Sequence, residues 1–220
     1  MIERAGQLRT EAGRAAGKED FPAAVQAATR SRQELIRAYS AVQKPLSGEF
    51  RGFWCHNAFG VEGMSWDEAV RILAVNGFTA IFPNMAWGGT AYYPSKVLPV
   101  SSHVETRGDQ LALCAAAARK AGIECHVWKV CWNLAERAPE PFVSQMKKEG
   151  RLQATFGGKT QQSWLCPTHP ANQKLEIDSL VELARRYDIA GIHMDYIRYP
   201  GSDNCFCEGC WRRFEKSAGV

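Results

Sequence analysis

From residue 50 onward, apolar residues follow two alternating patterns along the chain. Short runs rich in β-branched and aromatic side chains, typical of strands, occupy residues 51–57, 78–84, 123–132 and 189–197. Between them, apolar positions recur at helical spacing in residues 66–76, 109–121 and 171–187, and a shorter helix is indicated at 141–149. This alternation predicts an α/β fold, in which parallel strands are joined by right-handed helical crossovers.

Residues 1–48 have a polar helical pattern of their own. Asp20 can cap a helix and Pro22 suits its first turn, whereas Pro45 breaks it. The apolar positions of this segment at helical spacing are Ala28, Leu35, Tyr39 and Val42. We therefore expect a helical arm or linker over residues 1–48, and a second domain over residues 49–220.

The loops between the expected strands favour a barrel over an open, doubly wound sheet. The first strand is followed by GVEG, which lacks the glycine pattern of a phosphate-binding loop. The loops after the second and third strands are long and aromatic, as in TIM barrels whose loops build the active site. A complete (β/α)8 barrel needs about 250 residues. The chain is therefore expected to hold only the first four β/α units, the N-terminal half of a TIM barrel.

Charge and hydropathy exclude some classes of partner. The formal net charge of +4 comes from scattered Lys and Arg, without the basic band of a nucleic-acid-binding surface. No apolar run reaches the roughly 18–20 residues of a membrane span, and no signal peptide is visible at the start. We expect no nucleic acid, membrane or cofactor as partner, and the compartment stays open.

The fourth expected strand, in YDIAGIHMDYIRYP (187–200), carries a carboxylate. Because side chains alternate along a strand, Ile192 and Met194 should face the helices, and His193 and Asp195 the opposite side. Asp is unfavourable in a strand, and the carboxyl end of a parallel strand is where barrel active sites lie. Asp195 is therefore a candidate catalytic residue. The alternative is a purely structural salt bridge with Arg198.

Four segments resemble the glycosyl hydrolase-like 10 family. They are RGFWCHNAFG (51–60), NGFTAIFPNMAWGGTAYYPSKVLP (76–99), WLCPTHPANQ (164–173) and YDIAGIHMDYIRYP. The similarity covers about residues 50–215 in the family's order, and Tyr93-Pro94-Ser95 fits its Tyr-x-Ser loop. Asp188-Ile189-Ala190-Gly191 departs from the usual Asp-Val-Asp-Gly ahead of the strand. The resemblance implies a TIM barrel and a polysaccharide or oligosaccharide as substrate.

Glycoside hydrolysis uses two carboxylates, about 5–5.5 Å apart for retention and farther apart for inversion. Asp195 is one candidate, as nucleophile or as general acid. Glu62, Glu136 and Asp203 lie in the expected loops, but a partner beyond Val220 is favoured. The chain alone is then expected to be inactive. The alternative is a non-catalytic carbohydrate-binding barrel.

Sugar binding needs aromatic platforms and hydrogen-bonding side chains at the same rim. The candidates at or beside strand ends are His56, Asn57, Asn84, Trp87, Trp128, Trp132, His193, Tyr196 and Arg198. Trp164 also falls on this rim, and the orientation of Lys129 is ambiguous. For each aromatic or histidine the alternative is ordinary core packing.

The cysteines form two groups. Those within apolar or strand-like runs are expected to be buried free thiols: Cys55, Cys114, Cys125, Cys131 and Cys166. Cys205, Cys207 and Cys210 have the spacing of metal ligands, but a tetrahedral site would have to recruit Cys166 or a histidine. A metal site, a local disulfide and unliganded cysteines therefore all stay open, and a metal-dependent or structural protein is a third functional class.

Half a barrel would leave strands one and four as bare edges, and bare edges favour pairing with another chain. Self-association of the chain is therefore expected.

Overall fold

The computed structural model describes residues 1–44, 46 and 48–219. The chain divides into two compact units, Met1–Glu49 and Phe50–Val220.

The first unit is a pair of packed helices, α1 (Ile2–Ala16) and α2 (Phe21–Val42). The predicted cap is present, because the Asp20 carboxylate accepts a hydrogen bond from the Ala23 amide at 3.1 Å. The predicted break at Pro45 lies outside the described residues. The apolar positions at helical spacing do not form a core: Ala28, Leu35, Tyr39 and Val42 are all exposed.

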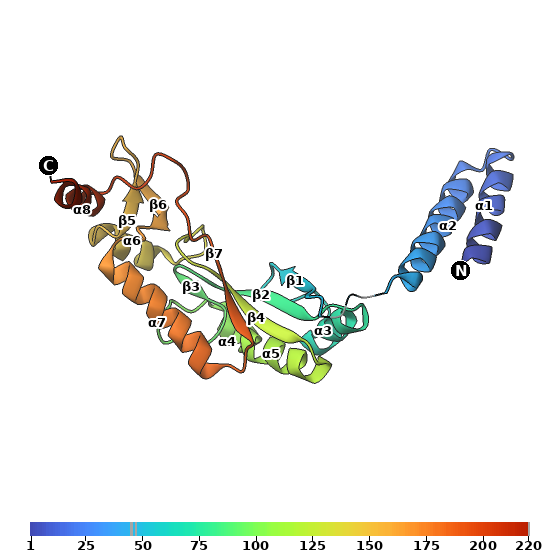
Figure 1. Cartoon of the computed structure of the whole chain (residues 1–220), viewed down its shortest axis with the longest axis horizontal. Coiled ribbons are helices and arrows are strands. Elements are labelled where there is room, and N and C mark those ends of the chain that lie inside the picture. Colours follow the sequence, from blue (N-terminus) through green and yellow to red (C-terminus); the bar gives the residue numbers. More distant parts are fainter. Residues whose placement is uncertain (45, 47, 220) are drawn as a thin grey trace. The chain divides into compact units, whose positions relative to one another are not determined.

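The second unit is built on a parallel sheet. Its strands, in spatial order, are β1 (Gly52–Cys55), β2 (Ala80–Trp87), β4 (Glu124–Val130) and β7 (Gly191–Asp195) (Figure 1). The connecting segments contain α3 (Trp66–Val75), α5 (Gln110–Ala121) and α7 (Pro170–Arg186). The α/β class and the parallel order of the four predicted strands are therefore confirmed.

The two faces of this sheet have different partners. One face packs against the helices, and its core includes Val70, Ile81, Leu111, Val127 and Leu183. The residues that alternate with these along the strands form a smaller cluster on the other face: Ala80, Phe82, Trp128 and Val130. In a barrel this second face is the interior.

Further elements lie in the loops that follow the strands. The loop after β2 contains β3 (Thr90–Ala91) and α4 (His103–Arg107). The segment after β4 contains α6 (Glu140–Lys148), β5 (Leu152–Ala154) and β6 (Thr160–Leu165), and α8 (Glu208–Ala218) follows β7. The helix α6 was predicted, whereas the antiparallel hairpin of β5 and β6 was not.

No helix within the described residues is both long enough and apolar enough to cross a membrane.

Candidate active site at the carboxyl ends of the strands

Asp195 is the last residue of β7, on the interior face of the sheet. Its main chain pairs with β4, where its carbonyl oxygen accepts a hydrogen bond from the Cys131 amide at 2.9 Å. Its Oδ2 accepts a hydrogen bond from Trp128 Nε1 at 3.0 Å, and its Oδ1 accepts one from the Tyr196 amide at 2.7 Å. Each carboxylate oxygen therefore has an N–H donor, and the side chain is held in one orientation. Among the described residues no ion pair joins Asp195 to Arg198, so the salt bridge of the alternative interpretation is not found.

Tyr196 turns the chain directly after the carboxylate. Its φ of +53° lies in the left-handed region, which residues with a Cβ rarely adopt. This conformation ends the strand and accompanies the donation from the Tyr196 amide to the side chain of the preceding residue. Unfavourable backbone conformations of this kind are concentrated at functional sites.

Three aromatic rings, from β2, β6 and the turn after β7, meet beside Asp195. The Tyr196 ring lies 5.6 Å from that of Trp164 and 6.5 Å from that of Trp87. Gly88 allows the chain after β2 to approach the chain after β4, since a Cβ there would lie 2.5 Å from the Cys131 carbonyl oxygen.

Two guanidinium groups lie over these rings. Arg198 Cζ lies 4.7 Å from the centre of the Tyr196 ring and 5.9 Å from that of Trp164, and Arg137 Cζ lies 4.5 Å from that of Trp87. Aromatic faces beside charged donors can stack on sugar rings and bind their hydroxyl groups. Arg137 was not among the sequence candidates, because its loop carries no strand-end signal.

The histidine candidates pack against rings on the same interior face. The His56 ring lies 4.5 Å from Trp128, and the His193 ring lies 6.4 Å from Trp128. His193 also contacts the rings of Trp54 at 5.7 Å and Phe82 at 5.5 Å. The predicted orientation of His193 is thus the observed one, and packing accounts for a large part of its surroundings.

Asn84 lies at the carboxyl half of β2 and is 1% exposed. Its Oδ1 accepts a hydrogen bond from Trp87 Nε1, which fixes the indole beside Tyr196. Its Nδ2 is buried and has no hydrogen-bond partner within the described residues. Asn84 therefore positions an aromatic residue of the site.

Three residues have contacts other than those of the group around Asp195: the candidates Asn57 and Trp132, and Lys129, whose orientation the sequence left open. Asn57 Oδ1 accepts a hydrogen bond from the Phe59 amide at 3.0 Å, within the turn after β1. Trp132 packs on the hydrophobic cluster of the β5–β6 region, and no ring contact among the described residues joins it to the other candidates. Lys129 faces the helices, where its Nζ lies 3.0 Å from Glu176 Oε2 in a buried ion pair.

Within the described residues, the hydrogen bonds to the Asp195 carboxylate come from N–H donors, and no second carboxylate joins them. Asp203 instead accepts a hydrogen bond from the Asn204 side chain at 2.7 Å. Burial raises the pKa of the neighbouring Cys131 thiol to about 12, so this thiol stays protonated and is a poor nucleophile.

The Tyr-x-Ser loop has a structural explanation. Glu182 of α7 accepts hydrogen bonds from Ser95 Oγ at 2.5 Å and from the Lys96 amide at 2.6 Å. Burial raises the pKa of the Tyr93 hydroxyl, since its side chain is fully enclosed in the core. This motif therefore attaches the loop after β3 to α7.

All eight cysteines are free thiols, so the disulfide that was one alternative for Cys205, Cys207 and Cys210 is not found. The five expected to be buried are buried. The sulfur of Cys166, however, lies among those of Cys205, Cys207 and Cys210, separate from the contacts of Asp195.

A fixed carboxylate among aromatic rings, at the carboxyl ends of parallel strands, is the arrangement found in barrel-type carbohydrate-active proteins. One solved structure supports the fold. The chain is similar to alpha-L-fucosidase isoenzyme 2 from Paenibacillus thiaminolyticus, with a TM-score of 0.56 and 18% identity over 78% of this chain. It is also similar to alpha-amylase from Geobacillus thermoleovorans, with a TM-score of 0.47 and 16% identity over 79% of this chain. The fold is that of a TIM barrel, represented here by four β/α units.

The chain belongs to the glycosyl hydrolase-like 10 family, whose model matches residues 49–209. The sequence motifs quoted above had indicated this family. A search of curated proteins gave no significant match. The chain spans 26% of the fucosidase and 44% of the amylase.

Proposed function

We propose that the protein acts on a polysaccharide or oligosaccharide as a glycoside hydrolase-like protein, with Asp195 as the nucleophile or the general acid. The observation that carries the proposal is the position of Asp195: the end of the fourth parallel strand, on the interior face, with both oxygens held by N–H donors. A catalytic carboxylate must be held in place in this way to react with one anomeric centre.

The aromatic rings supply the binding surface in this proposal. The rings of Trp87, Trp164 and Tyr196 stack on the apolar faces of successive sugar units. The guanidinium of Arg198, above two of these rings, donates hydrogen bonds to hydroxyl groups. A sugar held here lies next to the carboxylate, because Tyr196 both contacts the rings and donates its amide to Asp195.

A second candidate function is carbohydrate binding without catalysis. It is favoured by one observation, the missing second carboxylate around Asp195 among the described residues. Hydrolysis needs such a group as acid, base or nucleophile. We therefore propose that the 220-residue chain on its own binds sugars and does not cleave them.

The test measures binding and hydrolysis with the same variants. Oligosaccharides and soluble polysaccharides are titrated against the chain by calorimetry and by tryptophan fluorescence, and released reducing ends are assayed in parallel. Trp164→Ala is expected to weaken binding about tenfold, which corresponds to about 1.4 kcal/mol for one lost stacking platform. Trp211→Ala, an exposed tryptophan of α8, is the control and should leave binding unchanged.

Asp195→Asn separates the two functions. Any hydrolysis by the protein should be lost with this variant, whereas sugar binding should change little. The melting temperature should fall, because the amide nitrogen of asparagine cannot accept one of the two N–H hydrogen bonds. Hydrolysis that survives the substitution would show that Asp195 is not catalytic. If no carbohydrate of the panel binds, both functions are wrong.

A further inference from the structure

We propose that Cys166, Cys205, Cys207 and Cys210, here called the four-cysteine cluster, bind one structural zinc ion. Their Sγ atoms all lie within 4.8 Å of one another. Cys166 Sγ lies 3.6 Å from Cys210 Sγ and 3.7 Å from Cys207 Sγ. In a tetrahedral site with zinc–sulfur bonds of about 2.3 Å, neighbouring sulfurs are about 3.8 Å apart. These spacings therefore leave room for one ion at the centre.

The same distances argue against the other two interpretations of these cysteines. A disulfide joins its sulfurs at about 2.05 Å, and the cluster's sulfurs are unbonded thiols. If the cysteines had no ligand, nothing would favour bringing Cys166 together with the other three, which lie 39 or more residues later in the chain. Four thiolates in a tetrahedron select zinc or iron, and an iron–sulfur cluster with several irons would hold them farther apart.

The start of α8 favours the thiolate form of two of the four cysteines, which is the form that binds a cation. Cys207 is the N-cap of α8 and Cys210 lies in its first turn, where the helix dipole favours negative charge. The Cys210 amide donates a hydrogen bond to the Cys207 carbonyl oxygen at 2.8 Å, which holds these two cysteines together at the start of the helix. Arg213 Nη2, 3.7 Å from Cys210 Sγ, offsets part of the excess negative charge of a zinc ion with four thiolates.

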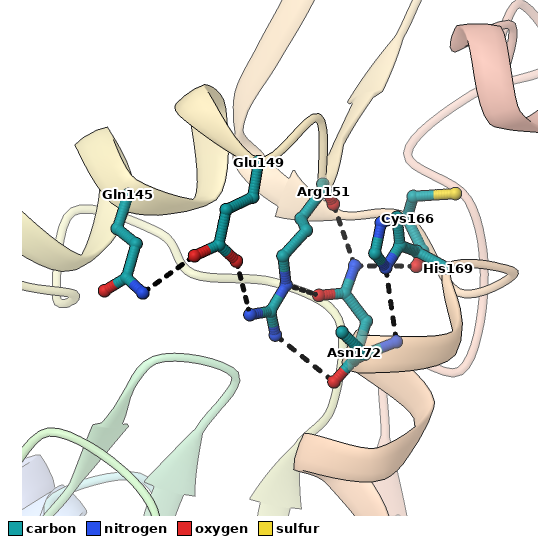
Figure 2. Close-up of polar contacts among 7 residues, drawn as sticks. Gln145, Glu149, Arg151, Cys166, His169 and Asn172 are labelled. Carbon is teal, nitrogen blue, oxygen red and sulfur yellow. Dashed lines mark hydrogen bonds and ion pairs between the residues drawn. The ribbon is translucent and has the colours of Figure 1, made fainter.

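The fourth ligand comes from a separately fixed segment. Cys166 directly follows β6, and its amide donates a hydrogen bond to the Arg151 carbonyl oxygen at 2.8 Å. Asn172 Nδ2 donates to the carbonyl oxygens of Arg151 and Cys166, each at 2.8 Å, and Arg151 Nε donates to Asn172 Oδ1 at 2.7 Å. Figure 2 shows this network with the Cys166 sulfur pointing away from it. The thiol is thus free to bind a metal while its backbone is held.

The zinc ion would attach the segment after β7 to the β5–β6 hairpin. α8 (Glu208–Ala218, all of it described) contains no buried residue, and a helix of this length is marginal on its own. Just before α8, the Phe206 amide donates a hydrogen bond to the Ala154 carbonyl oxygen at 2.7 Å, and Asn204 forms a β-bridge with Thr155. Four metal bonds supply the attachment that burial does not. This role is independent of the proposed carbohydrate chemistry.

Metal analysis of the whole chain tests the proposal directly. Protein produced in zinc-supplemented medium and purified with a reductant but no chelator should contain about one zinc per chain. Replacement by cobalt should give the intense absorption of tetrahedral cobalt thiolate. Cys210→Ser should lose at least nine-tenths of the zinc, whereas Cys210→His, which supplies another zinc ligand, should keep it. Cys55→Ser, the same change at a buried cysteine outside the cluster, is the control and should keep a full equivalent.

Hydrogen exchange keeps the test informative if a cysteine variant folds poorly. Removing the metal from unmodified protein with a chelator should speed exchange in residues 201–218 and leave β1, β2 and β4 protected. Less than a tenth of an equivalent of zinc, iron in its place, disulfides among the four cysteines under reducing purification, or unchanged exchange after chelation would each overturn the proposal.

Discussion

At the scale of single residues, the backbone of Tyr196 makes the sharpest prediction. Its positive φ is disfavoured by roughly 1–2 kcal/mol for a residue with a Cβ and is free for glycine. Tyr196→Gly and Tyr196→Ala both remove the ring, but only the alanine variant keeps the strain. The glycine variant should therefore be more stable than the alanine variant by about 1 kcal/mol, measured by urea unfolding.

A matched pair at Val127, where φ is that of a strand, supplies the control. There glycine should be less stable than alanine, because it loses more backbone entropy on folding. If glycine were also the less stable residue at position 196, the left-handed turn after Asp195 would be contradicted.

The sequence predicted Asp195 and its orientation because period-two alternation is a local property of a strand. It placed the end of that strand at residue 197, two residues too late. A positive φ is indicated in a sequence mainly by Gly, Asn or Asp, and position 196 is a tyrosine. The hydrogen bond from Trp128 to Asp195 joins residues 67 positions apart, and only the tertiary fold brings them together.

At the scale of the elements, the buried pair of Lys129 and Glu176 joins β4 to α7. The Lys129 side chain is 0% exposed and that of Glu176 is 9% exposed. Lys129→Met leaves a carboxylate buried without its cation and should destabilise the protein by about 3–5 kcal/mol. The double variant Lys129→Met/Glu176→Leu should recover most of this loss, as measured by urea unfolding in a double-mutant cycle.

An exposed ion pair provides the comparison. Lys120 Nζ lies 2.6 Å from Asp67 Oδ2, with 74% and 56% of the two side chains exposed. Lys120→Met should cost less than about 1 kcal/mol, because solvent screens the pair. Equal losses for Lys120→Met and Lys129→Met would contradict the buried pair.

Regular elements with strong patterns were predictable, and weakly patterned ones were not. Ser65 and Glu68 have the sequence spacing of a capping box, and Ser65 Oγ accepts a hydrogen bond from the Glu68 amide at 3.2 Å at the start of α3. The hairpin of β5 and β6 was missed because Thr160–Leu165 is mostly polar and its partner Leu152–Ala154 is very short. Lys129 was ambiguous in the sequence because a buried lysine needs a partner, and its partner lies on another element 47 residues away.

At the scale of the whole molecule, the sheet has two edges. β1 and β7 each pair with one neighbouring strand among the described residues, whereas every strand of a closed barrel pairs on both sides. Large apolar side chains on these edges are exposed, among them Trp54 at 46% and Met194 at 50%. An exposed apolar edge strand is a template for pairing with another chain.

We therefore expect the 220-residue chain to self-associate at micromolar concentration, with a mass in sedimentation equilibrium above that of one 24.5 kDa chain. Met194→Lys places a charge on the edge strand β7 and should shift the protein toward the monomer, since charged edge residues oppose strand pairing. The helical pair of the first unit also exposes apolar residues, so Tyr39→Lys is the necessary control. Dissociation by Tyr39→Lys with no effect of Met194→Lys would assign the association to α2 instead. A monomer in unmodified protein would contradict self-association through the open edges of the sheet.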